Sequence, residues 1–220
     1  MNTALSQLEA ALLISRVWPT SSLGLPLRIR PRSAPKLLPL DIGVALYSMG
    51  SDFERIRSLP LERLLNGRVA EMFAGQQLLA TRGGDLGRLH FWVAESARSN
   101  AETDFLLAGA ESPLPVEVKS GASGTLKSLH QFLWRANLKQ GVRLHCGPYS
   151  DQQHTVKMPE GQIAYRLQSL PLYMAEHLPL RGCRKRSKGS KRSKGSKRPR
   201  GSQEALLGGP RNPPRTIWPL

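Results

Sequence analysis

The sequence predicts an α/β fold, a mixed sheet flanked by helices, and three observations support it. Two strand-like runs, at 102–107 and 115–119, are separated by a segment that contains Gly109 and Pro113, as in a β-hairpin. Apolar residues recur at helical spacing on both sides of this hairpin. Further strand-like runs precede and follow it. Strands and helices that mix along a chain in this way favour a sheet with helices on its faces.

The first 35 residues predict a helix followed by a connector. Leucines recur at helical spacing between Thr3 and Ser15. Residues 18–35 are rich in Pro, Ser and Arg, a composition typical of irregular structure, although 25–29 is compatible with a short strand.

Two helices are expected before the hairpin. At 41–49 the sequence predicts a short helix in which Asp41 caps free N–H groups. The apolar spacing from Leu61 to Leu79 predicts a longer helix with one apolar stripe. Glu71 lies beside that stripe, where it is either a solvated surface residue or a third carboxylate for the site described below.

The remaining elements follow from the same patterns. Residues 89–93 predict a strand with Trp92 in the core and His90 as a structural imidazole. A helix is expected from Leu126 to Ala136, capped by Ser123 or Thr125. Two more strands, at 142–145 and 162–167, and a short closing helix at 171–178 complete the expected fold.

The hairpin also predicts a cluster of charged groups. Because side chains alternate along a strand, Val116 and Val118 point to the core while Glu117 and Lys119 point to the other face. If the two strands pair antiparallel, Asp104 comes close to Glu117. Two carboxylates beside an ammonium group suit a hard divalent cation such as Mg²⁺, which can activate water for attack on a phosphodiester. The alternative is a set of structural ion pairs.

An Asp on one strand followed by Glu-x-Lys on the next resembles the PD-(D/E)XK nuclease pattern. Residues 102–105 and 116–121 are similar to the EVDF and IEVKSG segments of the domain of unknown function 4143, usually the C-terminal half of bacterial and archaeal P-loop (AAA-like) ATPases. Residues 36–43, 67–73 and 170–174 resemble further segments of that family in the same order, so the likeness spans roughly residues 36–178.

This resemblance implies a restriction-endonuclease-like mixed sheet over residues 36–180 and a nuclease-like site that acts on or binds DNA. Glu71, Asp104 and Glu117 would hold Mg²⁺ or Mn²⁺, and Lys119 would position or activate water. These four are therefore the candidate catalytic residues.

The resemblance also implies a relation to an ATPase half that this sequence does not contain. The chain has no Gly-Lys dipeptide, so a P-loop and its ATP site are not expected, and residues 1–35 are interpreted as a remnant of the junction to that half. A separately encoded P-loop ATPase is a candidate partner. Two alternatives stay open: a non-catalytic binding or regulatory module, and a truncated remnant of such an ATPase.

Positive charge is concentrated at the C-terminal end. Residues 181–220 hold 13 of the 32 Lys and Arg residues but one of the 16 acidic ones. A six-residue repeat without apolar positions predicts a disordered basic tail, which either binds nucleic acid through counterion release or is a solubilising extension. Cys146 and Cys183 lack zinc spacing and favour a reducing cytoplasm, no membrane partner is expected, and the oligomeric state is not predicted.

Overall fold

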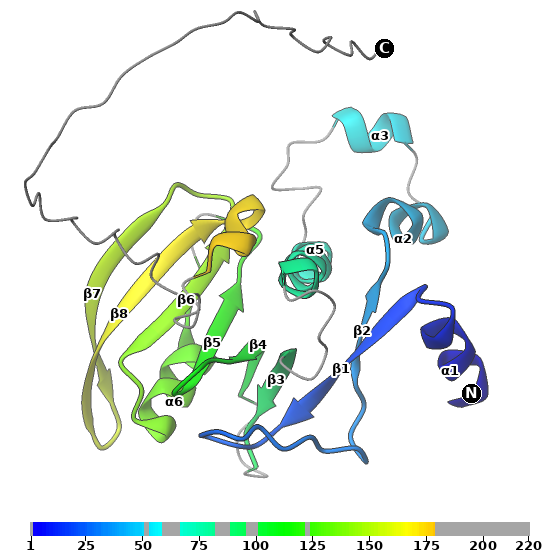
Figure 1. Cartoon of the computed structure of the whole chain (residues 1–220). Coiled ribbons are helices and arrows are strands. Elements are labelled where there is room, and N and C mark those ends of the chain that lie inside the picture. Colours follow the sequence, from blue (N-terminus) through cyan, green and yellow to red (C-terminus); the bar gives the residue numbers. More distant parts are fainter. Residues whose placement is uncertain are drawn as a thin grey trace, which may run out of the picture. The chain divides into compact units, whose positions relative to one another are not determined.

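The protein is described by a computed structural model that covers residues 2–50, 53–58, 67–81, 89–95, 101–121 and 124–178, all within one compact unit (Figure 1). The predicted tail at 181–220 lies outside these residues. The helices are α1 (Asn2–Ala10), α2 (Ile42–Ser48), α3 (Phe53–Ser58), α5 (Gly67–Thr81), α6 (Lys127–Ala136) and the 3₁₀ helix η2 (Leu172–His177). The strands are β1 (Ile14–Thr20), β2 (Lys36–Pro39), β3 (Leu89–Val93), β4 (Glu102–Ala108), β5 (Pro113–Val118), β6 (Gln140–His145), β7 (Ser150–Met158) and β8 (Gly161–Pro171).

These strands form one mixed sheet, which confirms the predicted α/β fold. Their order is β2-β1-β3-β4-β5-β6-β8-β7, with the β7–β8 hairpin at one side and the β1–β2 pair at the other (Figure 1). The pairs β1–β3, β5–β6 and β6–β8 are parallel, and the other neighbours are antiparallel.

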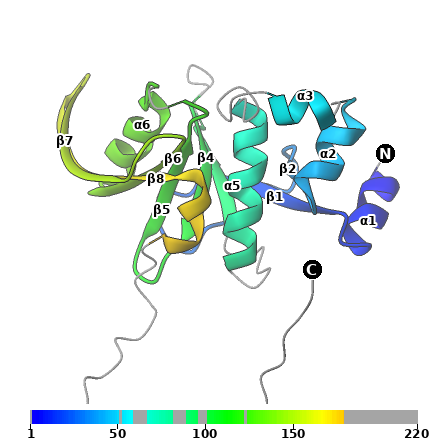
Figure 2. The same cartoon turned by 90° about the horizontal axis from the view of Figure 1, so that it is seen from above.

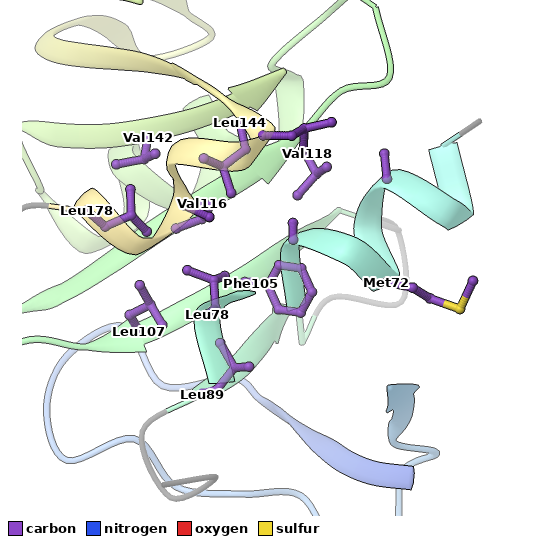
Figure 3. Close-up of a cluster of buried hydrophobic side chains, with 14 of the residues drawn as sticks. Met72, Leu78, Leu89, Phe105, Leu107, Val116, Val118, Val142, Leu144 and Leu178 are labelled. Atoms are coloured by element: carbon purple, nitrogen blue, oxygen red, sulfur yellow. The ribbon is translucent and has the colours of Figure 1, made fainter. Parts of the chain in front are cut away.

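Helix α5 packs against one face of the sheet. Its apolar residues recur at three and four positions, so one stripe faces the strands, and the buried side chains include Val69, Ala70, Ala74 and Leu78. They join β-strand residues and η2 in the largest buried cluster (Figure 3). Gly75 permits the close approach, because a Cβ there would lie 2.7 Å from a methyl group of Leu38.

Helix α6 covers the opposite face. Leu129 and Leu133 pack with residues of β8, while Phe132 packs with Trp92 and Leu106 in a separate buried cluster. Figure 2 shows the strongly curved β7 beside this helix. Since Leu106 contacts α6 whereas its neighbours Phe105 and Leu107 belong to the α5 cluster, β4 separates the two cores.

The predicted hairpin is present as β4 and β5, paired antiparallel with Phe105 opposite Val116. On its other side, β4 carries a bulge, because His90 pairs with Leu106 whereas Trp92 pairs with Thr103. One residue of β3 is therefore opposed by two of β4, Asp104 and Phe105. Bulges re-aim side chains and occur often beside active sites.

The N-terminal prediction is wrong in two places. The helix expected to reach Ser15 ends at Ala10, and strand β1 begins at Ile14. The connector expected from Trp18 is part of that strand up to Thr20, and it pairs in parallel with β3. Residues 25–29, which are compatible with a short strand, contribute one isolated bridge, between Ile29 and Thr20. The proposed domain division at residue 35 stays a prediction.

Most other elements agree with the sequence. Helix α2 is capped by Asp41, whose Oδ1 accepts a 2.8 Å hydrogen bond from the N–H of Val44. Helix α5 ends two residues beyond the predicted Leu79, and its predicted start at Leu61 lies outside the described residues. The predicted cap of α6 is wrong, because Leu126 holds the N-cap position without a side-chain hydrogen bond. Strand β7 was not predicted.

Candidate functional site

Strands β4 and β5 bring three of the four candidate catalytic residues together. The N–H of Val118 donates a 2.7 Å hydrogen bond to Oδ2 of Asp104, which fixes that carboxylate against β5. Extending the strand register by one pair places Asp104 opposite Glu117. Nζ of Lys119 lies 2.7 Å from Oε1 of Glu117. The contact between Glu117 and Lys119 agrees with the predicted side-chain alternation, and the antiparallel pairing that brings Asp104 near them agrees with the predicted hairpin. The catalytic roles of these residues stay a prediction.

Glu71, the fourth candidate, reaches the site from α5 through Lys36. The Lys36 ammonium group pairs with Glu71, lies 2.7 Å from Oε1 of Glu102, and donates a 3.2 Å hydrogen bond to the carbonyl oxygen of Asp104. It also lies 4.7 Å from the ring centroid of Phe91. Lys36 thus ties the first residue of β2 to α5 and to β4.

Burial and a neighbouring negative charge make Asp104 an unusually weak acid. Desolvation together with the charge of Glu117 raises the pKa of Asp104 to about 7, against the opposing effect of the Val118 hydrogen bond. Burial likewise raises the pKa of Glu117, although Lys119 partly offsets this. These carboxylates therefore ionise at a cost in free energy that a further cation would reduce.

For Lys36, attraction by neighbouring carboxylates outweighs the effect of burial on its pKa. Burial alone would lower the pKa of Lys36, but the attraction of Glu71 and the hydrogen bond to Glu102 outweigh it, so that pKa is raised. Lys36 therefore stays charged at neutral pH. Counting Glu102, the cluster holds four carboxyl groups and two ammonium groups.

One carboxylate oxygen in the cluster is left over. Oε2 of Glu117 is buried and has no hydrogen-bond partner in the described part of the chain. Buried polar atoms normally have a partner, so this oxygen fits a metal ligand. Asp104 and Glu117 offer the carboxylate oxygens that Mg²⁺ and Mn²⁺ prefer, and Mg²⁺ is commonly held by one or two carboxylates and several waters. Across the described ranges, no group of three or more His, Cys, Asp or Glu side chains is arranged to hold a metal ion.

A hollow opens beside the cluster. It measures about 310 Å³ and is lined by residues that include Arg30, Lys36, Phe91 and Glu102. The hollow borders the cluster at Lys36, and Arg30 adds positive charge to its lining.

The central part of the chain is similar to one known family. Residues 66–164 match the model of a domain of unknown function (DUF4143). This DUF4143 match contains all four candidate catalytic residues, Glu71, Asp104, Glu117 and Lys119. It is narrower than the likeness inferred from the sequence, and Lys36 lies outside it. No curated protein and no solved structure matches the chain.

The sequence missed two members of the cluster, Lys36 and Glu102. A lysine at the start of a strand has no local signature, and its partners Glu71 and Asp104 lie 35 and 68 residues further along the chain. Glu102 begins β4, where an exposed carboxylate is ordinary.

Among the described helices, none is long and apolar enough to cross a bilayer.

Proposed function

We propose that the chain is a metal-dependent phosphodiesterase of the PD-(D/E)XK type that acts on nucleic acid. The observation that carries this proposal is the unpartnered, buried Oε2 of Glu117, next to Asp104 and Lys119 on neighbouring strands. The DUF4143 match shows similarity to a domain of unknown function and supports no particular activity. The link to P-loop ATPases, a separately encoded ATPase as partner, and a cytoplasmic location are further parts of this proposal.

Each residue has a role that follows from its contacts. Asp104 and Glu117 would hold Mg²⁺ or Mn²⁺, which when bound lowers the pKa of a coordinated water and neutralises charge on the phosphate. The Val118 N–H holds Asp104 in position, leaving its second oxygen for a ligand. Lys119 keeps N–H groups besides the one at Glu117, so it can donate to a phosphate oxygen and offset negative charge there. Lys36 keeps Glu71 beside the cluster.

The competing function is a non-catalytic binding or regulatory module. The Lys36 network favours it, since Glu71 and Glu102 both have an ammonium partner and need no further ion. In that case the acidic cluster stabilises the meeting of β2, α5 and β4 and does no chemistry.

Cleavage of plasmid and single-stranded DNA in Mg²⁺ or Mn²⁺ tests the proposal. We expect nicking by the wild-type protein and a loss of at least about a hundredfold in Lys119→Ala, the order of effect of losing a charge-stabilising donor. Lys139→Ala, which changes an exposed lysine elsewhere, should cleave normally. No cleavage by the wild type, or equal cleavage by Lys119→Ala, would reject the nuclease function.

Metal binding separates the two functions further. Calorimetric titration with Mn²⁺ should give a binding signal for the wild type that Glu117→Gln abolishes. Binding without cleavage would favour the regulatory module, and no binding by folded wild-type protein would remove the metal from the proposal.

A further inference from the structure

A second hollow lies apart from the acidic cluster, between α6 and the end of the β7–β8 hairpin. It measures about 640 Å³, within the range of about 300–1,000 Å³ that is usual for ligand sites. Helix α6 buries Leu129, Phe132 and Leu133 against the sheet, so its other side faces the hollow. The curved β7 strand closes that side of the helix (Figure 2). We call this hollow the α6 groove.

The α6 groove is positively charged. Lys127 and Arg135 line it from the helix and Lys157 from the hairpin, against one acidic residue, Glu160. Within the described residues, Lys127, Lys157 and Glu160 take part in no salt bridge. Lys127 and Lys157 are thus not neutralised by an ion pair, and the Arg135 guanidinium lies over the Trp92 ring, 5.8 Å from its centroid, so the charge of the groove favours an anionic ligand.

The same groove contains an aromatic surface. Trp134 lines it and is half-buried, and its ring lies against the first residue of β8, since a Cβ at Gly161 would lie 3.1 Å from Cη2 of Trp134. Gly161 has φ +153°, a backbone conformation that residues other than glycine rarely adopt. The indole therefore lies close to a glycine whose substitution would be strained and would crowd the ring. Val156 and Met158 add apolar wall around it.

We propose that the α6 groove binds single-stranded nucleic acid, with a base against Trp134 and neighbouring phosphates at Lys127, Arg135 and Lys157. An indole among cations is the combination by which single strands are bound without sequence preference. A duplex is a poorer fit, because its bases are stacked on one another and cannot reach an indole inside a hollow. The inference rests on the groove alone and holds whether or not the acidic cluster cleaves.

Fluorescence anisotropy of a labelled oligothymidylate with the full chain tests the affinity. The buffer contains EDTA, so that cleavage plays no part. We expect the Lys127→Glu/Lys157→Glu double variant to bind at least about tenfold more weakly than wild type, as loss of two phosphate contacts should give. Lys139→Glu, an exposed charge reversal outside the groove, is the matched control and should change affinity much less.

Trp134 gives a second arm. Trp134→Ala should weaken binding by about 5- to 100-fold, the effect of losing one stacked base, and Trp134→Phe should restore most of it. Circular dichroism establishes that each variant is folded. If Trp134→Ala does not fold, the exposed lysine variants still decide the question, and equal affinity of the double variant and Lys139→Glu would overturn the proposal.

Photo-crosslinking locates the contact. An oligonucleotide that carries 5-bromouracil should crosslink to the tryptic peptide 128–135, which contains Trp134. Crosslinks confined to residues 181–220 would assign binding to the tail and overturn the proposal. Competition distinguishes the occupants: oligouridylate should displace the probe as well as DNA does, whereas equal displacement by duplex DNA or by polyglutamate would contradict a site for single strands.

Discussion

Oδ2 of Asp104 accepts a hydrogen bond from the backbone N–H of Val118, the residue between Glu117 and Lys119. This bond joins the bulged part of β4 to the charged end of β5 and holds a carboxylate where its charge is unfavourable. The unfavourable charge of Asp104 should make the stability of the fold depend on pH, which can be measured without any substrate.

Asp104 makes stability depend on pH. Its pKa is about 7 in the folded protein, above the ordinary carboxyl value near 4, so the folded state binds this proton more tightly than the unfolded chain does. The stabilising contribution is therefore complete below about pH 4 and is lost as the pH rises through about 7. We expect the melting temperature of the wild type to fall between pH 5 and pH 8.

Asp104→Asn should reduce that fall. Asn keeps an oxygen for the Val118 N–H but cannot ionise, so at pH 8 we expect a gain of about 1 kcal/mol, or about 2–4 °C for a chain of this size. Asp151→Asn is the control, because Arg166 lowers the pKa of Asp151 and its removal should leave the fall in place. Parallel melting curves of Asp104→Asn and wild type across this range would contradict the assignment.

Lys36 should contribute more to stability than the exposed Arg166 does. Lys36→Met removes the partner of Glu71 and Glu102 and one hydrogen bond to Asp104, so we expect a loss of about 2 kcal/mol in urea denaturation at pH 8. The loss should be smaller at pH 5, which lies below the raised pKa of Asp104, because the protonated Asp104 no longer attracts Lys36. Arg166→Met, which breaks the exposed pair with Asp151, should have little effect at either pH.

Gly75→Ala should separate α5 from the sheet. The added Cβ would lie 2.7 Å from Leu38 and 2.9 Å from Phe105, both buried, and overpacking of this kind costs about 1–3 kcal/mol. Gly67→Ala, at the start of the same helix, meets nothing within 4 Å and should be near neutral. Equal denaturation midpoints for the two variants would show that the core adapts without cost.

The cap of α2 gives a smaller and local effect. Asp41→Ala should lower stability by about 1 kcal/mol, because the N–H of Val44 loses its acceptor, whereas Asp41→Asn should retain most of it. Faster amide hydrogen exchange at the start of α2 in the Ala variant would locate the change. Unchanged exchange there would contradict a role for the cap.

The sequence predicted features that depend on neighbouring residues. Alternation placed Glu117 and Lys119 together on one face of β5, and the spacing of apolar residues found α5 and α6. The cap at Asp41 was also local and was predicted correctly. In each case the physical signal is contained in a few consecutive positions.

Features set by distant partners were not predicted. Strand β7 pairs along its whole length with β8, but it is mostly exposed and polar, so it shows no apolar alternation. Strand β1 contains Pro19 and Arg16 and was interpreted as helix and connector, because its partners β2 and β3 are not evident from its own residues. Lys36 acquires its role only when α5 and β4 come to its side.

The place of β1 determines how the protein can be shortened. Because β1 lies between β2 and β3, a truncation that begins at residue 36 would leave β2 without its neighbour and expose the backbone of β3 along one side. Open strand edges of that kind recruit other chains. A minimal version for expression should therefore keep the first 35 residues. A version that begins at residue 36 should be recovered as insoluble aggregate.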